Sequence, residues 1–416
     1  MSLQARLASL QAHGRLPSIV GGVLRGHELV ESAAVNGTVE TAYRIGSITK
    51  TFVAVLVMQL RDEGQLDLDD PLGRYLPESG YGAATIGELL SHASGMQSEP
   101  VGPWWERTTG GDLATLIAGN DGGGAVAGAG EYFHYSNLGY ALLGEVVARL
   151  RGAPWWDGVA DRLLEPLSMT RTSYGPVAPH AWGYSVEHAT GLLVREPHAD
   201  TGAMAPAGQA WSTVADLATW ATVLAGRRPD VLAPSTASEM HRGGVDPGYG
   251  LGLRHVQVGN LDLVGHSGSM PGFLASLFVD PHTGDGTVAL ANATTGMASE
   301  AVPEALLGDP PVSASEWVPT QRVPDQVAEL LGFWFWGNTA LDLRWHNETL
   351  QLWRVQTGTL SDVFEIRDGA VVGVSGYHRG ETLKAFQHHL ECATFVYTRT
   401  PYDPRAPIPG GVTATD

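Results

Sequence analysis

The stretch RIGSITKTFVAVLVMQLRDEGQLDLDD, residues 44–70, contains the strongest helical signal in the chain. After Ser47 the apolar residues recur at intervals of three and four, which is the spacing of one face of an α-helix. These residues are Phe52, Val53, Leu56, Val57 and Leu60. Gly64 is a typical helix stop signal. The pattern therefore predicts a helix that begins at Ser47 and ends near Gly64.

Lys50, in the first turn of this helix, is one of only two lysines, the other being Lys384. The chain has 25 lysines and arginines together, so arginine supplies the remaining 23. Arginine is effectively always protonated, whereas a buried lysine can lose its proton and act as a base. A lysine in a chain that otherwise uses arginine is therefore a candidate for chemistry that a guanidinium cannot perform.

The composition argues against several classes of protein. A formal net charge of −19 argues against non-specific nucleic-acid binding, which requires a basic surface. Cys392 is the only cysteine, which excludes an internal disulfide and any metal site with several cysteines. The N-terminal residues lack a secretory signal, and the apolar run 52–58 is too short to cross a membrane. We therefore expect a cytoplasmic protein that binds neither membranes nor nucleic acid.

Changes of pattern along the chain predict two domains. Residues 1–308 combine helices in the middle with strands near both ends, which is typical of an α+β domain. Residues 309–326 form a proline-rich linker. Residues 327–416 read as short alternating strands with an Asp368-Gly369 hairpin signal, and predict a small antiparallel barrel or sandwich. Helices are expected at 3–13, 85–91, 137–150 and 213–225, and strands at 18–35 and 250–293.

Ser47 and Lys50 form the pattern S-x-x-K, in which both side chains share one face of the helix. A serine hydroxyl is a poor nucleophile until a neighbour takes its proton. Burial against the apolar face that carries Val53 and Val57 would lower the pKa of Lys50 and help it to do so. The free N–H groups at the helix N-terminus favour negative charge near Ser47. A serine three residues before a lysine also arises by chance, so the pattern needs support from other segments.

The segment YFHYSNLGYALLG, residues 132–144, offers side chains that could assist such a serine. Tyr135 and Asn137 lie at the start of a predicted helix. A tyrosine beside a lysine can share a proton with it, so Tyr135 and Lys50 could exchange the acid and base roles. Asn137 offers an amide that could orient a substrate carbonyl. The alternative for Tyr135 is a core residue with its hydroxyl bonded.

The segment VGHSGSMPGF, residues 264–273, places His266, Ser267, Gly268 and Ser269 at the end of a predicted strand. Gly268 would let a substrate backbone lie close along the strand edge. The backbone N–H of Ser269, with that of Ser47, could form an oxyanion hole. The alternative for His266 is a half-buried histidine with a local hydrogen bond.

In this order and spacing, the three segments resemble the serine β-lactamase and penicillin-binding-protein superfamily, most of all its class C-related branch. That branch includes esterases, D-aminopeptidases and D,D-carboxypeptidase-like enzymes. The resemblance covers about residues 15–300 and includes DEGQLDLDDPLGRYLPE (62–78), TIGELLSHASGM (85–96) and GQAWSTVADLATW (208–220). It implies a β-lactamase/transpeptidase-like fold, with an antiparallel sheet flanked by helices and an all-helical subdomain.

The resemblance also implies a catalytic role for three of these residues. Ser47 would be the acylated nucleophile, Lys50 its base partner, and Tyr135 the general base and acid. The backbone N–H groups of Ser47 and Ser269 would polarise the carbonyl. Neither a cofactor nor a metal is implied.

For substrate binding, the resemblance implies that Asn137 contacts the substrate amide. His266, Ser267 and Gly268 would stand where the family has its K-T-G triad. The departure is histidine in place of lysine at 266. A neutral imidazole would hold a substrate carboxylate less firmly than an ammonium. Since histidine is familiar here in the family's esterases and aminopeptidases, ester, amide or D-amino-acid-peptide substrates are favoured over β-lactams.

Three functions remain open at this point. The first is a serine hydrolase acting on a small-molecule or peptide substrate. The second is an acyltransferase, peptide cyclase or thioesterase that passes the acyl group to an amine. The third is a penicillin-binding sensor with little turnover.

The C-terminal region resembles the lipocalin-like barrel appended to some members of the superfamily, on the strength of LLGFWFWGNTALDLRW (330–345). Such a barrel could restrict substrate size or mediate homo-oligomer formation. We expect its tryptophans to serve as core and strut residues of the barrel rather than as a ligand cage; they are Trp334, Trp336, Trp345 and Trp353. His388 and His389 are adjacent on a predicted strand and so point to opposite faces, which makes them a poor metal pair. His92 is expected to be structural.

Overall fold

The computed structural model describes residues 2–308 and 316–401. Within them the chain forms two compact units. The first ends at Trp317 and does not include Val186–Val194; the second comprises Val186–Val194 and the chain from Val318 onwards. Part of the expected linker, 309–315, and the end of the expected barrel domain, 402–416, lie outside the described residues.

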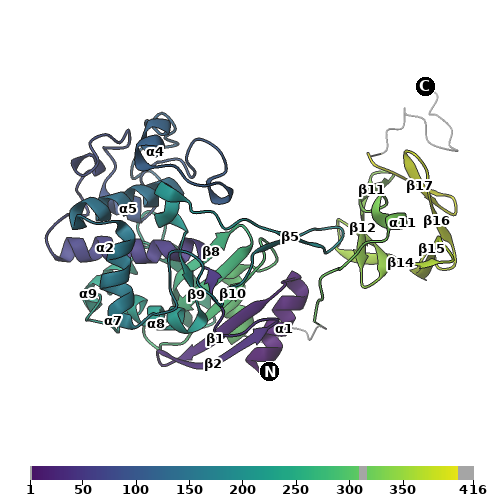
Figure 1. The fold of residues 1–416 in the computed structure, drawn as a ribbon, viewed down its shortest axis with the longest axis horizontal. Coiled ribbons are helices and arrows are strands. Elements are labelled where there is room, and N and C mark those ends of the chain that lie inside the picture. Colours follow the sequence, from purple (N-terminus) through teal and green to yellow (C-terminus); the bar gives the residue numbers. More distant parts are fainter. Residues whose placement is uncertain (1, 309–315, 402–416) are drawn as a thin grey trace. The chain divides into compact units, whose positions relative to one another are not determined.

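The first unit is built on a six-stranded antiparallel sheet with the order β2-β1-β10-β9-β8-β7 (Figure 1). Its strands are β1 (Ile19–Arg25), β2 (Glu28–Val35), β7 (Arg254–Val258), β8 (Leu261–Met270), β9 (Phe273–Val279) and β10 (Gly286–Ala291). The two N-terminal strands therefore join strands from the far end of the unit, because β1 pairs directly with β10. This arrangement confirms the expected α+β class.

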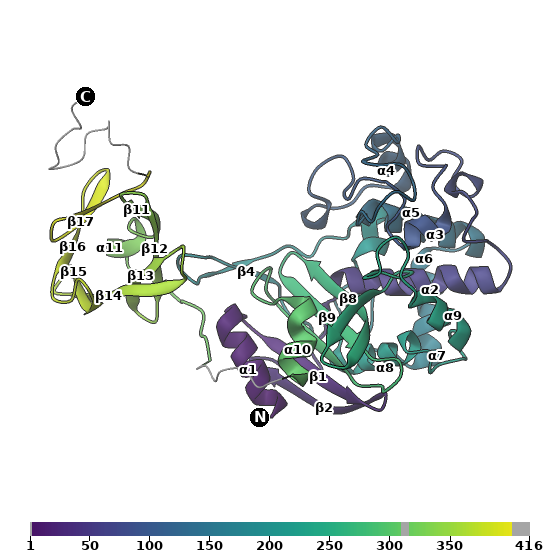
Figure 2. The same cartoon turned by 180° about the vertical axis from the view of Figure 1, so that it is seen from behind.

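Helices cover both faces of this sheet, and the alternation of side chains along β10 shows why. Val288 and Leu290 face the larger core. Three helices share this core: α2 (Thr49–Asp62), α5 (Asn137–Arg151) and α8 (Val214–Leu224). Ala289 and Ala291 face the other way, toward α1 (Leu3–Gly14) and α10 (Val302–Leu307). Figure 2 shows α1 and α10 together against the strands. The result is a three-layer domain with the sheet in the middle.

The helical subdomain is organised around α2 (Thr49–Asp62), which is buried along most of its length and packs against α5 (Asn137–Arg151). The other helices are α3 (Ile86–Leu90), α4 (Leu113–Gly119), α6 (Trp155–Val159), α7 (Glu165–Leu167) and α9 (Pro234–Met240). The predicted helices are confirmed, with one correction at Ser47. The α-helix begins at Thr49, and Ser47 lies in a 3₁₀ turn, Gly46–Ile48, that leads into it.

The second unit contains a closed antiparallel barrel of eight strands, in which β11 pairs with β18. The strands are β11 (Gly332–Trp336), β12 (Thr339–His346), β13 (Thr349–Arg354), β14 (Thr359–Arg367), β15 (Ala370–Gly376), β16 (Thr382–Ala385), β17 (His389–Cys392) and β18 (Phe395–Thr398). A short helix, α11 (Asp325–Ala328), precedes them. Asp368 and Gly369 both have positive φ, as a two-residue type I′ hairpin requires. The barrel and this hairpin confirm the sequence predictions.

The barrel tryptophans follow the prediction only in part. Trp334 and Trp345 are buried in the barrel core. Trp336 ends its strand beyond the core and is 44% exposed. Trp353 directly follows the buried Leu352 on β13, and successive side chains of a strand point to opposite faces, so Trp353 points out of the barrel. There the Arg344 guanidinium lies 5.4 Å from the centroid of the Trp353 ring.

A hairpin formed by β4 (Tyr184–Val186) and β5 (Leu193–Arg195) corrects the expected domain division. Its tip belongs to the second unit because it contacts β12 in two places. The backbone N–H of Trp345 donates to Ala189 O (2.7 Å), and His188 Nε2 lies 2.5 Å from Asp342 Oδ2. The continuous domain expected over residues 1–308 is therefore interrupted. Across the part of the chain that the structure describes, no helix combines the length and apolar character needed to span a bilayer.

Two glycines allow β8 to pack against the turn that carries Ser47. A Cβ atom on Gly46, which has φ +53°, would lie 2.5 Å from the backbone nitrogen of Ser269. A Cβ atom on Gly268 would lie 2.0 Å from the carbonyl oxygen of Ile45. The sequence suggested that Gly268 makes room for a substrate. Its missing side chain instead makes room for the backbone before Ser47, which brings Ser47 and Ser269 close together.

Gly268→Ala is expected to force β8 away from this turn. Overpacking of this kind costs about 1–3 kcal/mol in the free energy of unfolding, so thermal unfolding should occur several degrees lower, and labelling of Ser47 by a fluorophosphonate should slow. Gly175→Ala is the matched control, because an added Cβ there meets no atom within 4 Å. A Gly268→Ala variant that matches wild type in both measurements would refute this explanation of the glycine.

Candidate active site

The amine of Lys50 lies at the centre of the candidate active site. The side chain is completely buried and donates three hydrogen bonds. The acceptors are Ser47 Oγ (2.9 Å), Asn137 Oδ1 (2.7 Å) and Ala207 O (2.6 Å). An ammonium has three N–H groups, so all of them are satisfied here. The three acceptors come from three separate segments of the chain, which therefore meet at this nitrogen.

Burial lowers the pKa of Lys50 to about 7, because the protein interior disfavours the charged form. The Glu99 and Glu106 carboxylates oppose this shift, and the Arg254 guanidinium adds to it. Near neutral pH roughly half of the molecules therefore carry a neutral Lys50. The depressed pKa expected from the sequence is thus found, and a neutral amine within 2.9 Å of Ser47 Oγ can accept its proton.

Tyr135 completes the group around Ser47. Its ring centroid lies 5.0 Å from Lys50 Nζ, and its hydroxyl forms a hydrogen bond with Ser47. Burial raises the pKa of Tyr135 well above its usual value, so the phenol keeps its proton at neutral pH. A protonated phenol beside the nucleophile can donate a proton to a leaving group or relay one between its neighbours.

Behind Tyr135, a chain of hydrogen bonds fixes the protonation of two buried histidines. The Ser136 N–H donates to His92 Nδ1 (3.0 Å), so the neutral His92 carries its proton on Nε2, which lies 3.1 Å from the Tyr249 hydroxyl. Tyr249 in turn lies 3.0 Å from His266 Nε2, and His266 Nδ1 lies 2.5 Å from Ser267 O. Burial lowers the pKa of both histidines well below the usual value. Both are therefore neutral, as the sequence suggested for His266, and His92 is structural as expected.

Asn137 is held between two partners rather than pointing freely into the site. Its Oδ1 accepts from Lys50, and its Nδ2 donates to Glu99 Oε1 (2.7 Å). Glu99 Oε2 also accepts from the Trp105 indole N–H (2.6 Å). For Asn137 to bind a substrate amide through Nδ2, Glu99 would have to release it. Glu99 was not predicted, because it lies in an irregular segment with no motif around it.

The end of β8 leaves one backbone edge available beside Ser47. Strand β7 pairs with Leu261–Gly265 only, whereas β9 pairs with β8 as far as Met270. In the described part of the chain, His266–Met270 therefore has no strand partner on the side away from β9. Unpaired N–H and C=O groups on such an edge can bind an extended peptide.

This edge borders a pocket of about 410 Å³. Its lining residues are Ser47, Tyr135, Arg254, His266, Ser267, Gly268, Ser269, Leu274, Ala298, Ser299 and Glu300. The Arg254 guanidinium lies 5.4 Å from the Tyr135 ring centroid, and its Nη1 lies 3.3 Å from the Glu300 carboxylate. Glu300 also accepts from Ser267 Oγ (3.2 Å). Neither Arg254 nor Glu300 was predicted, because each is brought here only by the folding of the sheet.

The structure thus brings the expected site residues close together: Lys50 and Asn137 are buried behind Ser47, and the others line the pocket. Comparison with known proteins then gives the class. The beta-lactamase family model matches residues 3–308, well over half of the chain. The chain therefore belongs to the beta-lactamase family, within the superfamily of serine β-lactamases and penicillin-binding proteins. A second family model, a domain of unknown function (DUF7586), matches residues 323–399 in the barrel.

Two individual relatives are consistent with membership of this family. Penicillin-binding protein 4 of Amycolatopsis lactamdurans is 30% identical, over 69% of this chain and 79% of its own length. Beta-lactamase-like protein 2 of Dictyostelium discoideum is also 30% identical, but over 49% of this chain and only 39% of its own length. The chain therefore spans less than half of that relative.

Solved structures show the same fold. The octameric penicillin-binding protein homologue from Pyrococcus abyssi is 21% identical and superposes with a TM-score of 0.65, covering 95% of this chain and 99% of its own. A D-stereospecific amidohydrolase from Streptomyces sp. is 25% identical, with a TM-score of 0.63, over 73% of this chain and 99% of its own.

The lowered pKa of Lys50 predicts how labelling of Ser47 depends on pH. Because the neutral amine is the form that accepts a proton, the rate constant for fluorophosphonate labelling should rise with pH, about tenfold per unit below pH 7. It should level off above about pH 8, and Tyr135 should cause no decline near there, because its pKa is raised. The rate constant can be measured from labelling reactions that are quenched at a series of times, between about pH 5.5 and 9. A flat profile would contradict the assignment of Lys50 as the base.

Proposed function

We propose that the chain is a serine hydrolase that cleaves an ester or amide bond through an acyl-enzyme on Ser47. The observation that carries this proposal is the 2.9 Å hydrogen bond between Lys50 Nζ and Ser47 Oγ, made by an amine whose pKa burial lowers to about 7. An amine of this kind can activate a serine near neutral pH without a metal or a cofactor.

In the acylation step, neutral Lys50 takes the hydroxyl proton as Ser47 Oγ attacks the substrate carbonyl carbon. The negative charge that develops on the carbonyl oxygen is held by the backbone N–H groups of Ser47 and Ser269. The close approach of Gly46 to the backbone nitrogen of Ser269 supports this pairing. One such donor is worth about 10²–10³ in rate. Tyr135 then gives its proton to the leaving amine or alkoxide and recovers one from Lys50.

In the deacylation step, the same groups act on water. A water molecule takes the place of the leaving group beside Tyr135 and attacks the ester on Ser47. Its proton passes through Tyr135 to Lys50, and Ser47 recovers its own proton as the acid departs. Lys50 serves as the base in preference to Tyr135, because the raised pKa of the phenol makes its anion scarce at neutral pH.

The substrate class that the site favours is an ester or amide of a D-amino acid or a short peptide. The unpaired edge of His266–Met270 suits an extended backbone. Buried, neutral His266 offers no positive charge to a substrate carboxylate, which disfavours penicillin-like acids. The likeness to the Streptomyces D-stereospecific amidohydrolase supports the same choice. The octameric P. abyssi homologue likewise supports self-association, and the cytoplasmic location stays a prediction.

The two lysines provide a matched pair of variants. Lys50→Arg and Ser47→Ala should each lower kcat/KM for a D-amino-acid p-nitroanilide by at least about 10³, because nucleophilic attack needs both groups. Lys384→Arg should retain wild-type activity, since Lys384 is exposed on β16 in the barrel. Steady-state kinetics on the full chain measures all three. Wild-type turnover by Lys50→Arg would overturn the proposal.

Product analysis separates hydrolysis from the other functions. Mass spectrometry of products, with and without an amine acceptor, is expected to show the free acid as the main product in both cases. Aminolysis that dominates at low acceptor concentration would make the chain an acyltransferase. A burst of acylation by nitrocefin or a D-Ala-D-Ala peptide with no steady-state turnover of any ester or amide would make it a sensor.

A further inference from the structure

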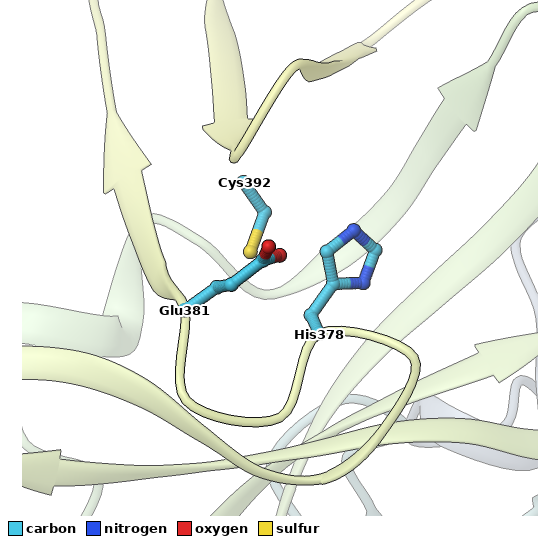
Figure 3. A group of neighbouring side chains, drawn as sticks. All are labelled: His378, Glu381 and Cys392. Carbon is cyan, nitrogen blue, oxygen red and sulfur yellow. The ribbon is translucent and has the colours of Figure 1, made fainter.

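A second cluster of reactive side chains lies inside the barrel, independent of the Ser47 site. His378 and Glu381 belong to the turn between β15 and β16, and Cys392 ends β17. Each offers one metal-binding atom, and these atoms lie within 4.8 Å of one another (Figure 3). Cys392 pairs with Leu383 across the β16–β17 ladder, which places the thiol beside the end of the turn.

The burial of this cluster needs an explanation. Cys392 is fully buried and His378 is 3% exposed. The Oε2 atom of Glu381 is inaccessible to water and has no hydrogen-bond partner. A carboxylate oxygen in this position costs free energy unless a cation or a donor reaches it. Asp362, which is 1% exposed, adds a second carboxylate to the same region. A divalent cation would offset the negative charge of both carboxylates.

The hydrogen bonds of His378 are typical of a metal-binding histidine. His378 Nδ1 lies 3.3 Å from Asp362 Oδ1, and the same oxygen accepts from the His378 backbone N–H (2.8 Å). A carboxylate on one ring nitrogen fixes the tautomer and leaves the other nitrogen free to bind a metal. That nitrogen, Nε2, lies 3.4 Å from the Tyr397 hydroxyl, which is a long contact that a metal would replace.

We propose that His378, Glu381 and Cys392 bind a zinc ion that fastens the β15–β16 turn to β17. Imidazole nitrogen, carboxylate oxygen and thiolate sulfur together suit Zn²⁺ better than the oxygen-seeking Mg²⁺ or Ca²⁺. Bond lengths of about 2.0–2.3 Å place tetrahedral ligands roughly 3.3–3.8 Å apart. Zinc binding would draw these ligand atoms, which lie within 4.8 Å of one another, closer together. A water molecule completes the coordination.

Binding exchanges one proton for the metal. The Cys392 thiol loses its proton to solvent as the sulfur–zinc bond forms, and the neutral imidazole and the carboxylate bind without further loss. We assign the ion a structural role, because all three donors belong to the barrel and join its turn to its strand. No zinc spacing is visible in the sequence, because the donors come from the turn between β15 and β16 and from the neighbouring strand β17.

The test uses the untagged full chain, stripped with a chelator, reconstituted with zinc chloride and dialysed against metal-free buffer. Elemental analysis should find about one zinc per chain. His378→Gln and Cys392→Ser should lower the zinc affinity at least tenfold. Glu391→Gln is the matched control, because Glu391 lies on the same strand, pairs with His389 and should leave zinc binding unchanged. Wild-type zinc content in Cys392→Ser, or no zinc after reconstitution, overturns the proposal.

Wild-type protein provides a second readout should the variants fold poorly. Replacement of zinc by cobalt(II) should produce a thiolate-to-cobalt charge-transfer band in the near ultraviolet. Because Cys392 is the only cysteine, this band can come from no other residue. Cys392 is buried, so an alkylating reagent reaches its thiol only when the barrel opens or unfolds. The rate of this alkylation should fall at least tenfold when zinc is bound. Bound cobalt without the charge-transfer band would exclude Cys392 as a ligand and overturn the proposal.

Discussion

The burial of one amine is the constraint on which the catalytic unit depends. Lys50 lies inside the core with its three hydrogens on Ser47, Asn137 and Ala207. Removing a charged group from water is costly, and here the cost appears as a pKa lowered to about 7. The surrounding core of α2 and α5 keeps water away from it. The same burial that destabilises the ammonium thus leaves an amine that is able to accept a proton near neutral pH.

Two of the groups that line this site are buried histidines that carry no charge. His92 and His266 are both neutral, and Tyr249 joins them in one hydrogen-bonded chain that ends at the backbone of β8. This chain supports the Tyr135 ring from behind, since the His92 ring lies 4.1 Å from it. A lysine at 266 would add a further cation to Arg254, which already acts on Lys50. Histidine avoids that added repulsion. Under the proposed function, substrate recognition then falls to the strand edge and to Arg254, which pairs with Glu300.

Sequence alone predicted the features that depend on local pattern, and missed those that depend on distant contacts. The α2 helix follows from the spacing of its apolar residues, and the type I′ turn follows from Asp368-Gly369. Glu99, Arg254 and Glu300 reach the site only through the fold, so no motif marks them. The docking of Val186–Val194 on the barrel, the outward turn of Trp353 and the meeting of His378 with Cys392 likewise depend on strand register, which one sequence does not reveal.

The central claim is that the acyl group is carried by Ser47, and peptide mapping of a trapped intermediate tests it most directly. Trypsin cleaves after Arg44 and Lys50, so Ser47 lies on the six-residue peptide Ile45–Lys50. The protein would be mixed with an activated ester, quenched in acid during turnover and digested. We expect the mass of the acyl group on this peptide, and we expect it to be lost when the quench is delayed until the substrate is exhausted. Turnover with the acyl group on another peptide, or on none, would contradict it.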